Sequence, residues 1–229
     1  MEASDFTGHI SRRFNRDIED LRNSVLAMGG LVENQLSKAV SAIISGDSEL
    51  GLRVANDDYM VNDLEVSIDE ECGRILATRQ PAASDLRLIV AIIKTITDLE
   101  RIGDEAAKIA RQAIRLCEEN VSPTNYIEIR HIGAHVSTLL HKALDAFARL
   151  DLELAVQVVQ EDSDVDKEYG SAMRSLVSEK LSCDVIPYLE PTRVSKYSAI
   201  LSRCITKFSR SHSMRMKNSP FSLSTCWSR

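Results

Sequence analysis

Apolar residues recur every three to four positions along most of the chain, and this helical periodicity limits the fold more than any other feature. The 229 residues include only 9 Gly and 5 Pro, although all-β folds use both residues at many turns. The clearest apolar stripe lies in an expected helix over residues 10–44 and consists of Leu21, Val25, Met28, Val32, Leu36, Ala39 and Ile43. These features predict an all-α protein built from long helices.

Short polar or proline-containing breaks divide the rest of the periodic pattern. Pro81 and Pro123 each mark a break, because proline cannot continue a helix. The helices expected after the first one span about residues 48–78, 84–120, 124–150 and 151–181. Since the connections between these long helices are short, we expect neighbouring helices to run antiparallel.

The chain carries an internal repeat with an offset of 104 residues. Between residues 36 and 67, eleven of 32 positions are identical to the positions 104 residues later, without a gap, and one such pair is Asp58 and Asp162. The unit is longer than the repeats of solenoid proteins. We therefore expect two tandem antiparallel three-helix bundles, the first over residues 10–120 and the second over residues 124–208.

The composition changes after about Leu181. Residues 181–229 contain two acidic and eight basic side chains and contribute +6 to the net charge, whereas residues 1–180 contribute −12 to the total of −6. The same segment holds three of the five Cys and the only Trp. We expect a divergent or degraded sixth helix near residues 191–208 and a disordered, basic, Ser-rich tail over residues 209–229. A frameshifted end and a genuinely divergent end both fit this pattern.

Charge and hydropathy exclude several classes of protein. No uncharged stretch reaches the roughly 20 residues of a membrane span, and Leu88–Ile93 near the middle is far shorter, so we expect no transmembrane segment. The N-terminus lacks the apolar core of a secretory signal, and the five Cys are too irregular for a disulfide framework. An acidic body argues against nucleic acid as a partner. We therefore expect a soluble, intracellular protein.

Two carboxylates follow the apolar stripe of the helix expected over residues 84–120. Ile93 and Ile96 belong to this stripe; Glu100 lies about 20° from Ile93 around the helix axis, and Asp104 lies about 20° to its other side. Because two buried carboxylates one turn apart repel each other, a cation must face them. A metal ion fits, since carboxylate oxygens are natural ligands of hard cations. An Arg or Lys from a neighbouring helix is the alternative.

The preceding helix and its counterpart in the repeat offer further oxygen ligands. Asp58, Asn62 and Glu65 occupy positions i, i+4 and i+7 and share one helix face. In the second repeat, Asp162 and Asp166 form another carboxylate pair at one-turn spacing. We predict metal ligands in both repeats, with a solvated acidic face as the alternative interpretation.

Two motifs carry a resemblance to a known family. The sequence QPAASDLRLI at residues 80–89, followed by DLERIGD at residues 98–104, resembles the PhoU family, as do the run DDYMVNDLE at residues 57–65 and the duplicated bundle. The similarity covers about residues 10–180. It implies a cytoplasmic, homodimeric regulator of phosphate-specific transport. Such a regulator links the ATPase subunit of the transporter to a phosphate-sensing histidine kinase and represses the phosphate-starvation response when phosphate is plentiful.

The resemblance also implies metal binding by E/D-x-x-x-D motifs, with iron, zinc, manganese or magnesium as the ion. The positions that match these motifs are Glu100, Asp104, Asp162, Asp166 and Asp58, with the neutral Asn62 in place of a second Asp. The offset of 104 residues places Cys204 and Phe208 where a further Glu and Asp are expected. One carboxylate pair is therefore missing from this sequence.

Enzymatic alternatives have weaker support. Di-iron bundle oxidases need Glu-x-x-His pairs from two helices, and Glu128-x-x-His131 supplies only one. Cys72 lies near an apolar stripe and is expected in the core rather than as a nucleophile. No Gly-rich phosphate loop or Cys-x-x-Cys motif occurs. We expect no enzyme activity; a di-metal oxidase or metal-storage bundle and a metal-free helical adaptor are the alternatives.

Overall fold

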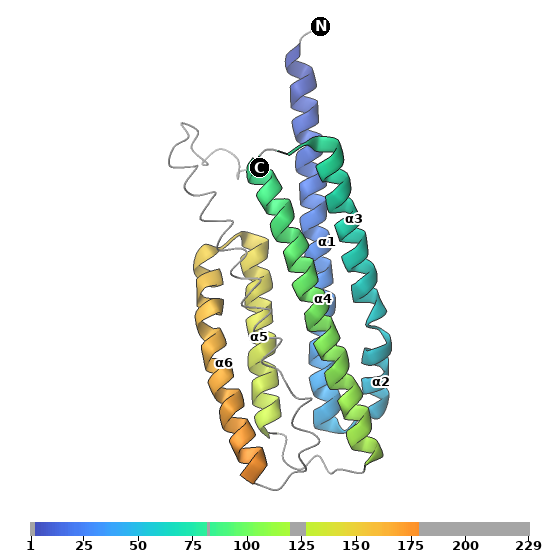
Figure 1. The fold of residues 1–229 in the computed structure, drawn as a ribbon, viewed down its shortest axis with the longest axis vertical. Helices are drawn as coiled ribbons and strands as arrows, with labels where there is room; N and C mark the ends of the chain where they lie inside the picture. The colour runs from blue at the N-terminus through green and yellow to red at the C-terminus, as the bar shows by residue number, and fades with distance from the viewer. Residues whose placement is uncertain (1–2, 82, 120–126, 179–229) are drawn as a thin grey trace.

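The computed structural model describes residues 3–81, 83–119 and 127–178. Within these ranges the chain is α-helical without any β-strand, and Figure 1 labels the helices. In chain order they are α1 (Ala3–Ser45), α2 (Ser48–Asn56), α3 (Tyr59–Arg79), α4 (Ala83–Glu118), α5 (Ile127–Arg149) and α6 (Leu152–Ser178). The prediction of an all-α fold is confirmed for this part of the chain.

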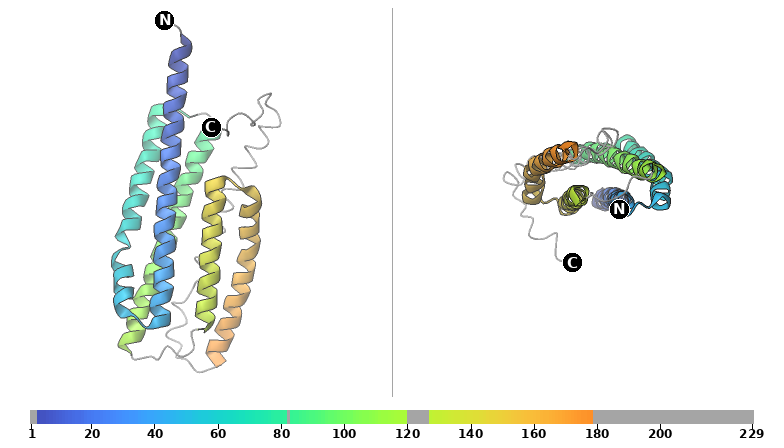
Figure 2. Two further views of the ribbon diagram at one scale, coloured as in Figure 1. Left: turned by 180° about the vertical axis from the view of Figure 1, so that it is seen from behind. Right: turned by 90° about the horizontal axis from the view of Figure 1, so that it is seen from below.

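The helices form an elongated bundle in which α1 is the central element. It packs against α2, α3, α4 and α5, whereas α6 packs mainly against α5 (Figures 1 and 2). The first turns of α1 project beyond the other helices (Figure 1). None of the helices in the described ranges combines the length and the apolar character needed to cross a bilayer. The sixth helix expected near residues 191–208 and the tail over residues 209–229 lie outside the described residues.

The core forms where α1 and α4 meet. All seven residues of the apolar stripe expected on α1 are buried, as the periodicity predicted. From α4, Ile89, Ile92, Ile96 and Leu99 are buried against them. Because each such large apolar side chain contributes about 1.5–3 kcal/mol when buried, this shared stripe fixes how α1 and α4 lie against each other.

We expected one continuous helix over about residues 48–78, and this expectation is wrong. The chain turns at Asp57 and Asp58, between α2 and α3. Asp58 is the N-cap residue of α3, but its side chain makes no capping bond; it accepts a hydrogen bond from Gln35 Nε2 at 2.8 Å instead. The sequence hides this break because neither Gly nor Pro marks it. Both halves also bury the same apolar face, through Val54 and Val61.

The two repeats meet through a reciprocal contact between α1 and α5. Gly29 lies against Leu144, and Gly133, the counterpart of Gly29, lies against Val40, the counterpart of Leu144. A Cβ atom at Gly133 would lie only 2.7 Å from Val40 Cγ1. Because each repeat offers the same pair of positions to the other, the contact resembles the isologous interface of a two-fold dimer.

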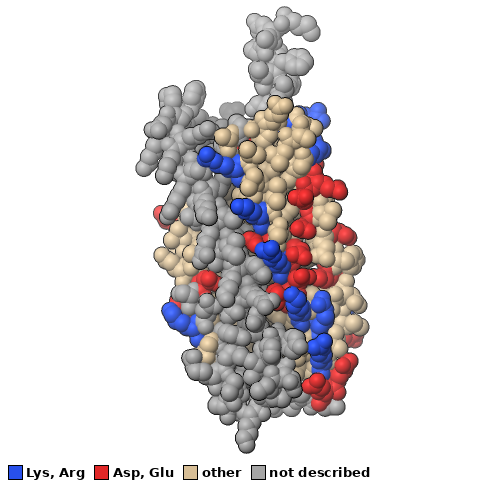
Figure 3. All heavy atoms as spheres, viewed as in Figure 1, with Lys and Arg blue, Asp and Glu red and all other residues tan. Residues whose placement is uncertain are grey.

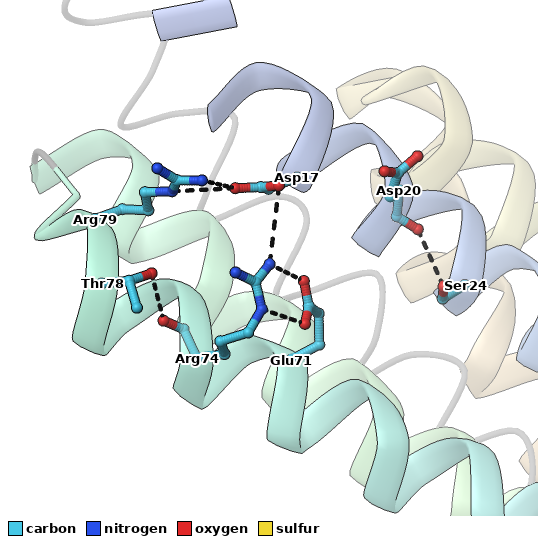
Figure 4. Close-up of polar contacts among 7 residues, drawn as sticks. All are labelled: Asp17, Asp20, Ser24, Glu71, Arg74, Thr78 and Arg79. Carbon is cyan, nitrogen blue, oxygen red and sulfur yellow. Dashed lines mark hydrogen bonds and ion pairs between the residues drawn. The ribbon is translucent and has the colours of Figure 1, made fainter. Parts of the chain in front are cut away.

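Ion pairs hold the end of α3 beside α1 (Figure 4). Arg79 Nε and Nη2 both donate to Asp17 Oδ2, at 3.1 and 2.9 Å. Arg74 donates to Glu71 on its own helix, and its Nη2 lies 3.8 Å from Asp17 Oδ1. The hydrogen bond from Arg74 lowers the pKa of Glu71. These contacts precede Gln80, whose left-handed backbone (φ 45°) turns the chain toward α4.

Candidate carboxylate site

The two carboxylates predicted on α4 lie at the edge of the core. Glu100 and Asp104 are half-buried. The buried face of α4 is centred nearer to Ile92 and Leu99, which are fully buried, whereas Ile93 is only partly buried. We expected Glu100 and Asp104 near the middle of the buried face of α4. This expectation is wrong, because α4 is rotated about its axis relative to the orientation that the Ile93 stripe predicted. Helices α1 and α2 both pack on α4, and the side of α4 that they cover is not the side centred on Ile93.

Glu100 faces a group of carboxylates. Burial raises the pKa of Glu100 above its ordinary value, and the negative charges of Asp104, Glu65 and Asp58 raise it further. The charge of Arg101 acts in the opposite direction with a smaller effect. The structure therefore brings together carboxylates from α3, its N-cap and α4. Their mutual repulsion favours either a proton or a bound cation among them.

Gln35 of α1 adds an amide group to this carboxylate group. Its side chain is 7% exposed, its Nε2 donates to Asp58, and its buried Oε1 has no hydrogen-bond partner. A Cβ atom at Gly103 would lie 3.2 Å from Gln35 Oε1 and 3.6 Å from Asp58 Oδ1, so Gly103 allows α4 to approach closely. Because Gly103 lies between Glu100 and Asp104 in sequence, the unsatisfied oxygen faces the segment that carries both carboxylates.

Gln35 and Asp98 are buried polar residues that the sequence analysis did not single out. Asp98 of α4 is 5% exposed. Burial raises its pKa to about 6, against the opposing charges of Arg101 and Lys94. A signal existed for Gln35, because it lies three residues after Val32 and thus continues the buried stripe of α1. The sequence offered no comparable signal for Asp98.

The other predicted ligands do not join this group in the described structure. Asn62 is exposed in the first turn of α3. Asp162 is half-buried on α6 in the second repeat, where Asp166 also lies, although its side chain is outside the described residues. Cys204 and Phe208 lie outside them as well. Within the described ranges, no three His, Cys, Asp or Glu side chains are arranged so that they could hold a metal ion.

The residues of the oxidase alternative lie on α5. His131 is exposed, and His135 Nδ1 lies 3.1 Å from Glu168 Oε2 on α6. His135 therefore contacts another helix of its own repeat and not the carboxylate group of the first repeat. Cys72 is fully buried in α3, and burial raises the pKa of its thiol to about 12. Its place in the core agrees with the prediction and keeps the thiol protonated.

The fold and the carboxylate group define a class of protein: a duplicated helical bundle with acidic residues gathered in the first repeat. The PhoU domain family matches residues 25–113 and 129–200, so that one match falls in each repeat. The chain belongs to the PhoU family, as the resemblance of its motifs predicted.

Relatives and solved structures agree with this assignment. The chain is 58% identical over 178 residues to the phosphate-specific transport system accessory protein PhoU homolog of Pseudomonas aeruginosa, covering 78% of this chain and 74% of that protein. It is 46% identical over 178 residues to the phosphate-specific transport system accessory protein PhoU of Escherichia coli K12, covering 78% and 73%.

The crystal structure of PhoU from Pseudomonas aeruginosa matches with a TM-score of 0.82 at 48% identity, covering 86% of this chain and 99% of that chain. The phosphate transport system regulatory protein PhoU from Streptococcus pneumoniae matches with a TM-score of 0.70 at 26% identity, covering 92% and 100%. The helical-bundle fold is therefore that of PhoU crystal structures.

Proposed function

We propose that this chain is an accessory protein of a phosphate-specific transport system and a negative regulator of phosphate uptake and of the phosphate-starvation response. The observation that carries the proposal is its 58% identity to an accessory protein of that transport system, on a fold that matches 99% of a PhoU crystal structure. The relatives are named for accessory or regulatory roles and not for a reaction. This naming supports a function that depends on protein contacts rather than on catalysis.

The proposed partners are the ATPase subunit of the transporter and the phosphate-sensing histidine kinase, contacted in the cytoplasm by a homodimer of this chain. An apolar stripe on the outer face of α2 and α3 supports a contact role. Leu52, Tyr59 and Val66 are spaced seven residues apart, and more than half of each side chain is exposed. Exposed apolar residues that form one stripe are typical of surfaces that bind other proteins.

The experiment expresses the chain in cells that lack their own PhoU and carry a reporter driven by a phosphate-starvation promoter. At high phosphate, the chain should lower reporter output relative to an empty vector, and starvation should restore it. A Leu139→Asp variant is the control, because a charge at this fully buried position should unfold α5 and abolish repression. Full reporter output with the intact chain present at normal levels would contradict the proposal.

We further propose that Glu100 and Asp104 hold a metal ion, such as iron, zinc, manganese or magnesium, with the amide oxygen of Gln35 as an additional ligand. Two observations support it: neighbouring carboxylates raise the pKa of Glu100, and Gln35 Oε1 is buried without a partner. The donor types fit, because carboxylate and amide oxygens suit hard cations. The ion would neutralise the repulsion among these carboxylates.

Elemental analysis of the purified chain tests this metal site. A Glu100→Gln/Asp104→Asn double variant keeps the shape of both side chains and should lose the ion of the first repeat. The matched control, Asp162→Asn/Asp166→Asn, removes the carboxylate pair of α6 in the second repeat and should leave that ion in place. An unchanged metal content in the Glu100/Asp104 variant would show that these residues are not the ligands, without affecting the proposed regulatory function.

A further inference from the structure

A row of basic side chains follows the exposed face of α4. The basic row consists of Arg87, Lys94, Arg101, Lys108 and Arg115, spaced seven residues apart, and all five are exposed. Figure 3 shows basic side chains in a column that follows the course of α4 in Figure 1. Seven residues advance a helix by about 10.5 Å and drift by about 20° around its axis, so the row is roughly 42 Å long and winds by about 80° around α4 from end to end.

Two carboxylates of α4, one buried and one partly buried, lie beneath the basic row. Arg101 Nη1 lies 3.5 Å from Asp98 Oδ1, and Lys108 Nζ lies 3.0 Å from Glu105 Oε1. The basic side chains of these pairs are 52% and 48% exposed, whereas the acidic ones are 6% and 12% exposed. A molecule that approaches α4 therefore meets the cations first. Among the charged residues described as exposed on α4, only Glu118 in the last position is acidic.

The helix beside the basic row has the opposite charge. The exposed acidic residues of α3 are Asp63, Asp69 and Glu70, and Figure 3 shows acidic side chains over α3 next to the basic column. The positive potential is therefore about one helix wide. A membrane or a nucleic acid duplex presents a broader anionic surface and would meet the repulsive charges of α3 at the same time. An acidic partner about as wide as one helix would not meet the repulsive charges of α3.

Apolar side chains accompany the first part of the basic row. Leu86 and Val90 are 42% and 41% exposed, and Lys94 follows Val90 at the same spacing of four residues. Apolar contact area at this end favours a protein partner over a simple linear polyanion. A second helix has the same rise per residue as α4, so carboxylates spaced seven residues apart along it would meet the basic row in register.

We propose that the basic row, together with Leu86 and Val90, is the docking site for an acidic amphipathic helix of a partner protein. The proposal rests on the proposed function in one respect, because a regulator that acts through protein contacts needs such a surface. It adds the chemistry of the partner: one helix with Glu or Asp at seven-residue spacing and an apolar end.

The test measures binding of the full chain to a fluorescent synthetic helix of about four heptads, with Glu at one position of each heptad and Leu beside the first two. A peptide of the same composition, with its Glu residues scattered around the helix, is the control ligand. An Arg87→Glu/Lys94→Glu variant should bind the first peptide at least about tenfold more weakly than the unaltered chain, and binding should weaken with salt. The Arg149→Glu/Lys167→Glu variant, with the same charge change at exposed positions of the second repeat, should bind like the unaltered chain.

Several results would overturn the proposal: equal binding of both peptides, no loss in the Arg87/Lys94 variant, or tighter row-dependent binding to anionic vesicles or duplex DNA than to the peptide. If the chain instead self-associates in sedimentation experiments, loses this association in the Arg87/Lys94 variant and does not bind the peptide, the row is a contact surface for a second copy of this chain. Matching circular dichroism melts establish that the variants are folded. The reporter assay separates the two proposals: repression without peptide binding rejects only the docking site, whereas peptide binding without repression rejects only the proposed function.

Discussion

The two repeats build the same turn after their first helix with different residues. Gly46 has a left-handed φ of 65°, and its counterpart Leu150 has a φ of 53°. In both turns the next residue, Asp47 or Asp151, donates its backbone N–H to a carbonyl five residues earlier, at 3.0 and 2.9 Å. The comparison shows that the helices and the hydrogen bonds impose this backbone shape. Glycine makes the shape easier to adopt but does not create it.

The repeats also share the residue that starts the next helix. Asp47 Oδ1 accepts a hydrogen bond from the backbone N–H of Leu50 at 2.8 Å, and Asp151 Oδ1 accepts one from Leu154 at 3.0 Å. A side-chain cap of this kind stabilises a helix start by about 1 kcal/mol. The connection between helices is therefore the part of the repeat unit that both copies preserve.

The repeats differ where charge is buried. The first repeat breaks its helix at Asp58 and gathers carboxylates around Glu100, whereas α6 continues through Asp162 without a break. At the positions equivalent to Asp98 and Glu100 the sequence has Ser202 and Cys204. The first repeat therefore bears an electrostatic cost that the sequence of the second does not repeat, as expected for a functional site.

The largest expected effect concerns the buried charge of Asp98, which only the first repeat carries. Its folded pKa of about 6 exceeds the ordinary value of 3.8, so folding is favoured when Asp98 is protonated. This contribution is complete below about pH 4 and is lost as the pH rises through 6. At about 1.4 kcal/mol per pKa unit, Asp98→Asn should stabilise the chain by about 3 kcal/mol at pH 7 in urea denaturation.

The control for this prediction is Asp164 on α6, an exposed residue whose pKa is lowered by a hydrogen bond from Lys167. Its contribution to stability has the opposite sign: it is present above the ordinary pKa and is lost as the pH falls. Asp164→Asn should therefore destabilise slightly at pH 7. A pH dependence of unfolding that is the same for Asp98→Asn and the unaltered chain would contradict the assignment.

The next effect concerns how closely α2 approaches α4. A Cβ atom at Gly51 would lie 2.8 Å from the backbone oxygen of Ala110, which cannot move away as a flexible side chain could. Gly51→Ala should therefore destabilise the chain by about 2 kcal/mol in urea denaturation. The counterpart Ala155 is already fully buried on α6, so Ala155→Gly should cost only about 1 kcal/mol. Increased stability of Gly51→Ala would show that the close contact is not required.

Exchanging residues at the shared turn should give effects of opposite sign. Gly46→Ala places a Cβ atom at a left-handed position and should cost about 1 kcal/mol. Leu150→Gly removes that strain, and after the entropy cost of glycine it should gain about 0.5 kcal/mol. Thermal melts of both variants measure the difference. Equal destabilisation by the two changes would mean that packing of Leu150, and not backbone strain, dominates the second turn.

The smallest effect concerns an ion pair that only the second repeat forms. Lys142 Nζ donates to both carboxylate oxygens of Glu161 at 2.8 Å, whereas the counterparts Lys38 and Asp57 are exposed and line a cavity of about 50 Å³. Lys142→Met should cost about 0.5 kcal/mol, and Lys38→Met should leave stability nearly unchanged. A double-mutant cycle with Glu161→Gln measures the pair directly, and a coupling energy near zero would remove this difference between the repeats.

All seven residues of the stripe predicted on α1 are buried, whereas the buried face of α4 was predicted only approximately. The α1 stripe is unambiguous because its members follow one another at intervals of three or four residues from Leu21 to Ile43. On α4, Ile89, Ile92, Ile93 and Ile96 allow more than one face, and only packing against α1 and α2 selects Ile92 over Ile93. The break at Asp58 was invisible for a similar reason, since an unbroken helix would bury the same residues.

The candidate site also contains residues that the sequence predicted and one that it did not. The sequence pointed to Glu100 and Asp104 because they are four residues apart on one helix, and to Asp58 because it recurs as Asp162. It did not point to Gln35, whose partnership with Asp58 spans 23 residues of chain and depends on the turn before α3. Spacing along one helix reports which side chains share a face, but it says nothing about which other helix that face meets.

The sequence by itself determined that this protein is a helical bundle built twice, which residues of α1 form its core, and to which family it belongs. These properties follow from local periodicity, from a repeat at a constant offset and from short motifs. Only the tertiary structure decided that Gln35, Asp58 and Glu100 gather at one place and that Asp98 is buried. Such groups come from separate helices, and their environment depends on the angle and rotation at which those helices pack, which no local pattern in the sequence specifies.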